Sequence, residues 1–198
     1  MEPSTDAISV ISSIALIIKQ LKSSSDDVLG NVLPFSPVRV KLVELQKNVE
    51  IAETKIDEAK VVIQQLGKLI RAYSDLISDV RIAGASADKF GEIIGLEETL
   101  LIKYKMFFVN KVRDEYTRVT SGVAKLPKPK STEAAKKVGN LEIISRSIRD
   151  LNQKLRDQDD LSKVPEVLKN ISNQYSDMES TLAELLKEIL IGFDPSEG

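Results

Sequence analysis

The residue types that most often carry out catalysis or bind transition metals are missing from this chain. It contains no histidine and no cysteine, so it lacks the commonest general base, the commonest metal ligand, thiolate zinc sites and disulfides. Gly67-Lys68 is followed by Leu69, which does not match the phosphate-binding loop of nucleotide-binding proteins. The acidic run from Asp157 to Asp160 lacks the glycine and the terminal glutamate of a calcium loop. We therefore expect no enzyme activity, no cofactor and no metal.

The remaining chemistry is electrostatic. A short lysine tract surrounds Pro127 and Pro129, in a stretch where each proline disfavours helix at the residue before it. Such a tract either is a solvated linker or attracts anionic lipid headgroups, which contribute about 1 kcal/mol per basic residue near a membrane surface. The candidate anionic-lipid contacts are Lys125, Lys128, Lys130, Lys136 and Lys137.

Charge and composition restrict the choice of partner. The chain has 198 residues, with 28 basic against 30 acidic side chains and a net charge of −2, so it has no overall positive field to attract DNA or RNA. A hydrophobic content of 42% is enough for a continuous core in a chain of this length. We expect one domain spanning residues 1–198, with no nucleic-acid partner and no small-molecule substrate.

Apolar residues recur by alternating steps of four and three, the spacing at which a helix presents one face to a partner helix. The first such seam consists of Val38, Leu42, Leu45, Val49, Ala52, Ile56, Ala59, Ile63, Leu66, Ile70, Tyr73, Ile77 and Val80. The second consists of Val164, Leu168, Ile171, Tyr175, Met178, Leu182, Leu185 and Ile189. The pattern predicts an all-α, antiparallel helical bundle with coiled-coil-like heptad packing, made of four long helices and a short apolar N-terminal helix.

Capping residues and breaks set the expected helix ends. We predict helices over residues 5–23, 37–82, 87–120, 132–157 and 163–191, a linker over 121–131 and a tail over 192–198. Ser23 to Asp27 and the sequence Ala83-Gly84-Ala85 are interpreted as helix ends, and Ser36, Ser86 and Pro37 as helix starts. Four aromatic residues in the third helix, Tyr104, Phe107, Phe108 and Tyr116, are interpreted as core, with an aromatic-walled pocket as the alternative.

The N-terminal helix is the unusual element. Ala7–Ile18 carries no charge, yet it is shorter than the ~20 residues of a membrane-spanning helix, and no basic residue precedes it as in a secretory signal. Apolar residues lie on most of its sides, so it is either central in the core or made to contact something else. The candidate membrane or partner contacts are Ile8, Ile11, Ile14, Leu16, Ile17 and Ile18.

The order of these features resembles the N-terminal HeLo-type helical bundles of cell-death proteins. That group includes fungal heterokaryon-incompatibility effectors, mixed-lineage-kinase-like pseudokinases and the RPW8-type domains of plant immune receptors. The likeness rests on Met1-Glu2-Pro3, on the charge-poor helix Ala7–Leu21 and on Val32-Leu33-Pro34-Phe35 leading into a long amphipathic helix. The resemblance implies oligomerisation and membrane permeabilisation driven by the first helix, and hence a part in cell death.

These features lead to two functional expectations. The first is a non-catalytic helical-bundle protein, cytoplasmic and peripheral at membranes, that acts by oligomerisation and by membrane contact or permeabilisation through its N-terminal helix. The alternative is a soluble coiled-coil adaptor or scaffold that works by protein–protein interaction, with that helix in the core and the long seam mediating self-association.

Overall fold

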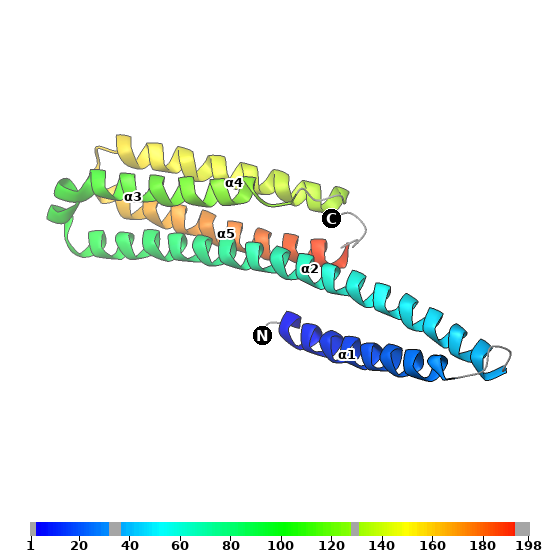
Figure 1. Ribbon diagram of the computed structural model, residues 1–198. Coiled ribbons are helices and arrows are strands. Elements are labelled where there is room, and N and C mark those ends of the chain that lie inside the picture. Colours follow the sequence, from blue (N-terminus) through cyan, green and yellow to red (C-terminus); the bar gives the residue numbers. More distant parts are fainter. Residues whose placement is uncertain (1–2, 32–36, 128–130, 193–198) are drawn as a thin grey trace. The chain divides into compact units, whose positions relative to one another are not determined.

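The computed structural model describes residues 3–31, 37–127 and 131–192, and the described part of the chain is helical with short connections (Figure 1). The elements are α1 (Pro3–Gly30), α2 (Pro37–Leu96), α3 (Glu98–Ala124), α4 (Thr132–Asp157), the short 3-10 helix η1 (Leu161–Lys163) and α5 (Val164–Ile191). The predicted all-α fold is therefore confirmed. Ser36, a predicted helix start, lies outside the described residues, while Pro37 begins α2.

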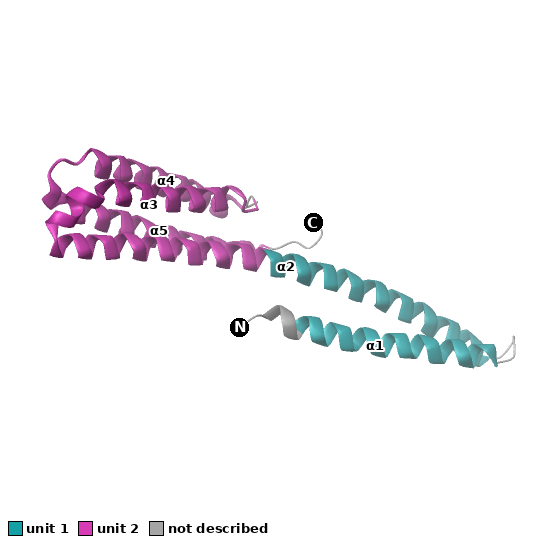
Figure 2. Ribbon diagram, turned by 60° about the vertical axis from the view of Figure 1, so that its left-hand side comes forward, with its two compact units in different colours: residues 1–68, 195–198 teal, residues 69–194 magenta. Residues whose placement is uncertain are grey.

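The chain divides into two compact units (Figure 2). Unit 1 consists of residues 1–68 and 195–198, and unit 2 of residues 69–194. The helix α2 contributes its first part to unit 1 and its second part to unit 2. The expectation of a single domain over residues 1–198 stays a prediction.

Unit 2 contains the hydrophobic core. Its helices are the second part of α2, α3, α4 and α5, and every residue of the core cluster lies between Leu69 and Leu185. The second predicted seam is confirmed as a buried face, since its members from Val164 to Leu185 are all buried on α5. Burial of that many aliphatic side chains, at roughly 1.5–3 kcal/mol each, is the main force that holds these four helices together.

Polar contacts join the helices of unit 2 around this core. Arg81 on α2 binds Glu179 on α5 at 2.6 Å, and Lys137 on α4 binds Glu184 on α5 at 2.7 Å. Between α3 and α4, the Asn152 side chain donates a hydrogen bond of 3.2 Å to the carbonyl oxygen of Val109. Ser131 caps α4 as its side chain accepts from the backbone N–H of Ala134 at 3.0 Å, and the observed bounds of α4 are those predicted.

The predicted end of the first helix at residue 23 is wrong, because α1 continues to Gly30 and has 28 residues, as many as α5. One of the serines that were expected to stop the helix forms a hydrogen bond back to it. The hydroxyl of Ser25, a buried residue, donates to the carbonyl oxygen of Lys22 at 2.9 Å. Serine lowers helix propensity by competing for backbone groups, but a bond to the preceding turn is compatible with helix.

The predicted boundary between the second and third helices is also wrong. The helix α2 runs through Ala83-Gly84-Ala85 to Leu96, so Ser86 is not a cap, and α3 starts at Glu98 instead of residue 87. Gly84 serves close packing: a Cβ atom added there would lie 3.1 Å from the Cβ of Tyr175 on α5. Glu97, with extended backbone angles of φ −141 and ψ 90, separates α2 from α3. At its other end α3 reaches Ala124, beyond the predicted end at residue 120.

The aromatic residues of α3 are only partly core. Phe108 is buried, but Phe107 is 57% exposed and Tyr104 39% exposed, so the prediction that all four lie in the core is wrong. The rings of Phe90, Phe107 and Phe108 contact one another, with centroids 4.8 to 6.3 Å apart. Phe107 therefore covers the edge of the core without entering it.

Unit 1 is organised differently. It consists of α1 and the first part of α2, which lie side by side and are joined by an ion pair of 3.1 Å between Lys22 and Glu53. A hydrogen bond from Gln46 to Asp26 also links them. Among the described side chains of this unit, Val49 is the one buried hydrophobic residue. Unit 1 therefore has almost no core of its own.

Candidate functional site

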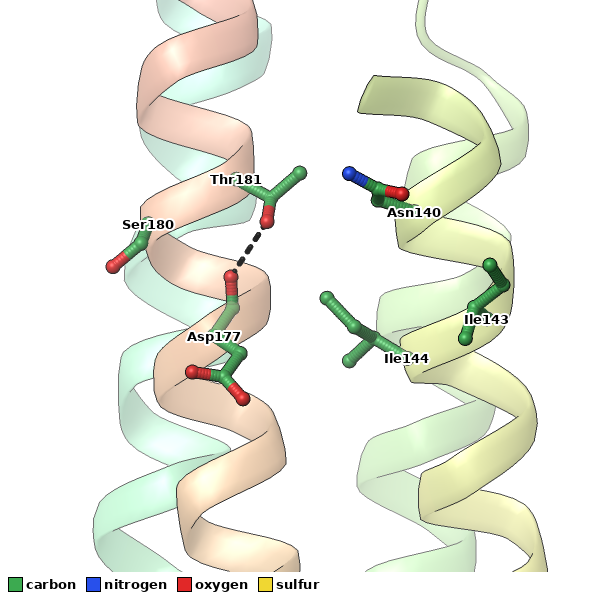
Figure 3. A pocket seen from close by; sticks show the side chains of 6 residues that line it. All are labelled: Asn140, Ile143, Ile144, Asp177, Ser180 and Thr181. Carbon is green, nitrogen blue, oxygen red and sulfur yellow. Dashed lines mark hydrogen bonds between the residues drawn. The ribbon is translucent and has the colours of Figure 1, made fainter. Parts of the chain in front are cut away.

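The described part of unit 2 offers a shallow hollow between α4 and α5 (Figure 3). Its volume is about 370 Å³, and it is lined by Asn140, Ile143, Ile144, Asp177, Ser180 and Thr181. The Thr181 hydroxyl donates to the backbone carbonyl oxygen of Asp177 at 2.8 Å, so it is held by the helix backbone and not by a general base. The hollow thus shows no nucleophile paired with a base, which nucleophilic catalysis requires.

Three titratable side chains lie inside the core of unit 2. Burial raises the pKa of Tyr73 to about 12, and burial together with the negative charge of Glu115 raises the pKa of Tyr175. Burial also raises the pKa of the Glu115 carboxyl, although Ser86, Lys111 and Arg118 act in the opposite direction. Lys111 lies 3.7 Å from that carboxyl. One carboxylate oxygen of Glu115 and both tyrosine hydroxyls have no hydrogen-bond partner.

These buried groups are part of the packing and do not form an accessible site. Glu115 is 6% exposed, Tyr175 1% and Tyr73 0%, so a substrate cannot reach them without separating the helices. Within residues 3–31, 37–127 and 131–192, no group of acidic side chains is arranged to hold a metal ion. The features of the molecule that remain to be explained are therefore on its surface.

Among the described residues, exposed large aliphatic side chains are densest on α1, with seven in a helix of 28 residues against nine in the 60 residues of α2. One side of α1 is less exposed, and its residues are spaced three or four apart. The ion pair between Lys22 and Glu53 shows that this side lies toward α2. It consists of Ala7, Ile11, Ala15, Ile18, Lys22, Ser25 and Leu29. A second series follows the same spacing, and each of its large members is between 44% and 57% exposed. We call this series the outer α1 stripe: Val10, Ile14, Ile17, Leu21 and Val28.

The structure separates the residues predicted to make membrane or partner contacts. Ile14 and Ile17 belong to the outer α1 stripe, whereas Ile8 and Leu16, at 40% and 58%, are exposed on the polar side of the helix. Ile11 and Ile18 are half-buried on the α2 side and are not available in the same way. Val10, Leu21 and Val28 were missed at the sequence level, although their steps of four, four and seven relative to Ile14, Ile17 and Leu21 were a usable signal.

The helix α1 is longer than predicted, and it is long enough to span a membrane. Ala7–Gly30 is by length and composition a candidate span of 24 residues, and none of its most apolar window is buried. The expectation that this segment is too short to span a bilayer was based on the uncharged stretch alone. The finding has little weight by itself, because signal sequences near an N-terminus pass the same test.

The lysine tract is only partly brought together. Lys136 forms an ion pair of 3.3 Å with Glu133, and Lys137 one of 2.7 Å with Glu184; the hydrogen bond to Glu184, together with its charge, raises the pKa of Lys137. Lys125 is exposed after the end of α3, while Lys128 and Lys130 lie outside the described residues. The paired lysines present less positive charge to a membrane than their number suggests.

Comparison with protein-family models, with curated proteins and with solved structures finds no match for this chain. The resemblance to HeLo-type bundles is therefore untested.

Proposed function

We propose that the protein is a non-catalytic interaction protein in which unit 2 is the stable body and unit 1 is the working part. The observation that carries this proposal is the contrast in burial between the units. The core cluster belongs to unit 2, whereas α1 exposes Ile8, Val10, Ile14, Leu16, Ile17, Leu21 and Val28. An exposed apolar face of this extent is typical of a surface that binds something.

The proposed activity is oligomerisation and contact with membranes through α1, with the lysine tract as a secondary contact to anionic lipid. The protein would then be cytoplasmic and peripheral at membranes. The transfer of each aliphatic side chain from water into the lipid is favourable by about 25 cal/mol of free energy per Å² of apolar surface. Permeabilisation and a part in cell death rest on the HeLo resemblance alone.

We further propose that unit 2 is an antiparallel four-helix bundle with heptad packing. The short connections support this arrangement, since a few residues between helices lead to antiparallel neighbours. The buried series from Val164 to Leu185 on α5 supports the heptad spacing. Such a body would tolerate changes in the working helix without unfolding.

Sedimentation with vesicles containing anionic lipid tests the membrane proposal. Full-length protein is expected to sediment with the vesicles, and Ile14→Asp is expected to weaken sedimentation about tenfold or more. Ile143→Asp is the matched control, because Ile143 is an exposed isoleucine of unit 2 at 64%. Equal binding by both variants would contradict the proposal.

Leakage of a dye from the same vesicles tests permeabilisation separately from binding.

Replacement of the five lysines of the tract by glutamine is expected to lower binding to anionic vesicles and to leave binding to neutral vesicles unchanged. Salt should reduce the difference between the two lipids, since screening weakens exposed charges.

The second candidate function is a soluble adaptor that binds a partner protein through α1. The observation that favours it is the polar side of α1, where Ser9, Ser12, Ser13, Lys19, Gln20 and Ser23 lie exposed. A helix with one apolar stripe and a polar remainder is suited to lie in a groove of another protein. If vesicles never bind and the protein stays folded, this candidate replaces membrane contact.

A further inference from the structure

The outer α1 stripe has the geometry of a helix–helix contact. Val10, Ile14, Ile17 and Leu21 follow one another by steps of four, three and four, and Val28 lies one heptad after Leu21. Ser24 occupies the remaining position of the series. This spacing keeps the same face toward a second helix from residue 10 to residue 28, about 27 Å at 1.5 Å per residue.

We propose that a second copy of the chain covers this stripe in solution, so that two α1 helices pack against each other. Two identical apolar stripes are self-complementary around a two-fold axis. The stripe is bordered on its open side by Ser13 and Gln20, which bring no like charges together along its centre. Lys22, by contrast, lies on the other side and is paired with Glu53.

The exposed area fits such a dimer. The large members of the outer α1 stripe are between 44% and 57% exposed. That amounts to roughly 450 Å² of apolar surface per copy and ~900 Å² for two copies; because apolar groups make up about two thirds of such an interface, the total area approaches the ~1,200 Å² at which specific interfaces begin. Val49 is the one buried hydrophobic side chain among those described in unit 1, so a second copy would supply the core that this unit lacks.

The polar side of α1 favours a second helix over a membrane as the occupant at rest. Helices that lie in a membrane surface carry many lysines and arginines on the polar face. The polar side of α1 carries mainly serines, with Lys19 as its basic residue and Asp26 and Asp27 at its end. The inference extends the proposed function: the dimer covers Ile14 and Ile17, which are proposed to contact the membrane, so the dimeric form and a form bound to a membrane through this stripe exclude each other.

Sedimentation equilibrium of the full chain without lipid tests the dimer. Wild-type protein is expected to be dimeric at micromolar concentration. Ile14→Asp and Ile17→Asp are expected to weaken dimerisation at least about tenfold, since each places a carboxylate inside an apolar contact. Ile143→Asp should dimerise like the wild type. A monomeric wild type, or dimers unaffected by both α1 variants, would overturn the inference.

The absence of native cysteine allows a direct test of the contact. Ile17→Cys should be joined into a covalent dimer by a short bis-maleimide reagent, whereas Lys19→Cys, on the polar side of the same helix, should remain monomeric. Similar cross-linking of both would refute contact through the stripe.

Vesicle binding separates this inference from the proposed function. If dimers form but vesicles never bind, membrane contact fails and the dimer stands. If vesicles bind a monomeric protein, the dimer fails and membrane contact stands. If both occur, covalently dimerised Ile17→Cys should bind vesicles at least tenfold more weakly than the same variant left uncross-linked, and equal binding would refute the mutual exclusion.

Discussion

Replacement of Gly84 by leucine should destabilise unit 2, because this glycine lets α5 approach α2 closely. An added Cβ would lie 3.1 Å from the Cβ of Tyr175 and 3.7 Å from the carbonyl oxygen of Ser172. Tyr175 cannot give way easily, since its side chain is 1% exposed within the core. Forcing additional carbons into a well-packed contact typically costs about 1–3 kcal/mol.

Gly95→Leu is the matched control for this change. Gly95 lies in the same helix, is exposed, and has no atom within 4 Å of an added Cβ. Removing a glycine from a helix there gains up to ~1 kcal/mol. Because Gly84→Leu has the same gain in helix propensity, that contribution cancels, and the two variants should differ in free energy of unfolding by about 1–3 kcal/mol from the tight contact, with Gly84→Leu the less stable.

Urea unfolding followed by circular dichroism at 222 nm measures this difference. With a slope of about 2 kcal/mol per molar urea, the midpoints of the two variants should lie about 0.5–1.5 M apart. Equal midpoints would refute the reasoning, because they would mean that α5 does not pack against the Gly84 face of α2. Gly84→Ala should fall between the wild type and Gly84→Leu, since the gain in helix propensity opposes a tight contact.

Three further predictions concern stability. Burial raises the pKa of Glu115 above its ordinary value of 4.5, so the stability of unit 2 should fall as the pH rises from that value through the raised pKa and the carboxyl ionises. Glu115→Gln should remove this loss. In urea titrations the variant should therefore be more stable than the wild type at neutral pH, and the difference should disappear below pH ~4. Met178→Asp should unfold unit 2, as it buries a charge in a position with 0% exposure, while Ile14→Asp should leave the circular dichroism spectrum unchanged. A fragment of residues 69–194 should unfold cooperatively with the near-ultraviolet spectrum of a packed core, since it includes the whole core cluster.

The spacing of apolar residues was sufficient to predict the fold class and most of the helices. The series from Val164 to Ile189 identifies the buried face of α5 because heptad spacing and burial have the same physical origin. The bounds of α4 follow from Ser131 and from the polar turn after Asp157 for a similar reason, since capping is a local interaction.

The errors arose where the role of a residue depends on a distant part of the chain. Gly84 was interpreted as a helix end, because the sequence does not reveal that Tyr175 lies against it. Ser25 was interpreted as part of a break, although its hydroxyl bonds to the preceding turn. Likewise, the first heptad seam was treated as one continuous core stripe, yet Leu45 is 41% exposed in unit 1 whereas Tyr73 is 0% exposed in unit 2.

That difference along one seam has a functional meaning. Tyr73 belongs to the core cluster of unit 2, to which α2, α3, α4 and α5 all contribute, whereas the described part of unit 1 contains α1 and the first part of α2. Two helices cannot cover all the apolar surface that each presents, so the part of the seam in unit 1 and the outer α1 stripe stay in contact with water. Covering this apolar surface would be favourable by about 25 cal/mol per Å². Association through α1, which we propose above with a second copy or with lipid, would cover it.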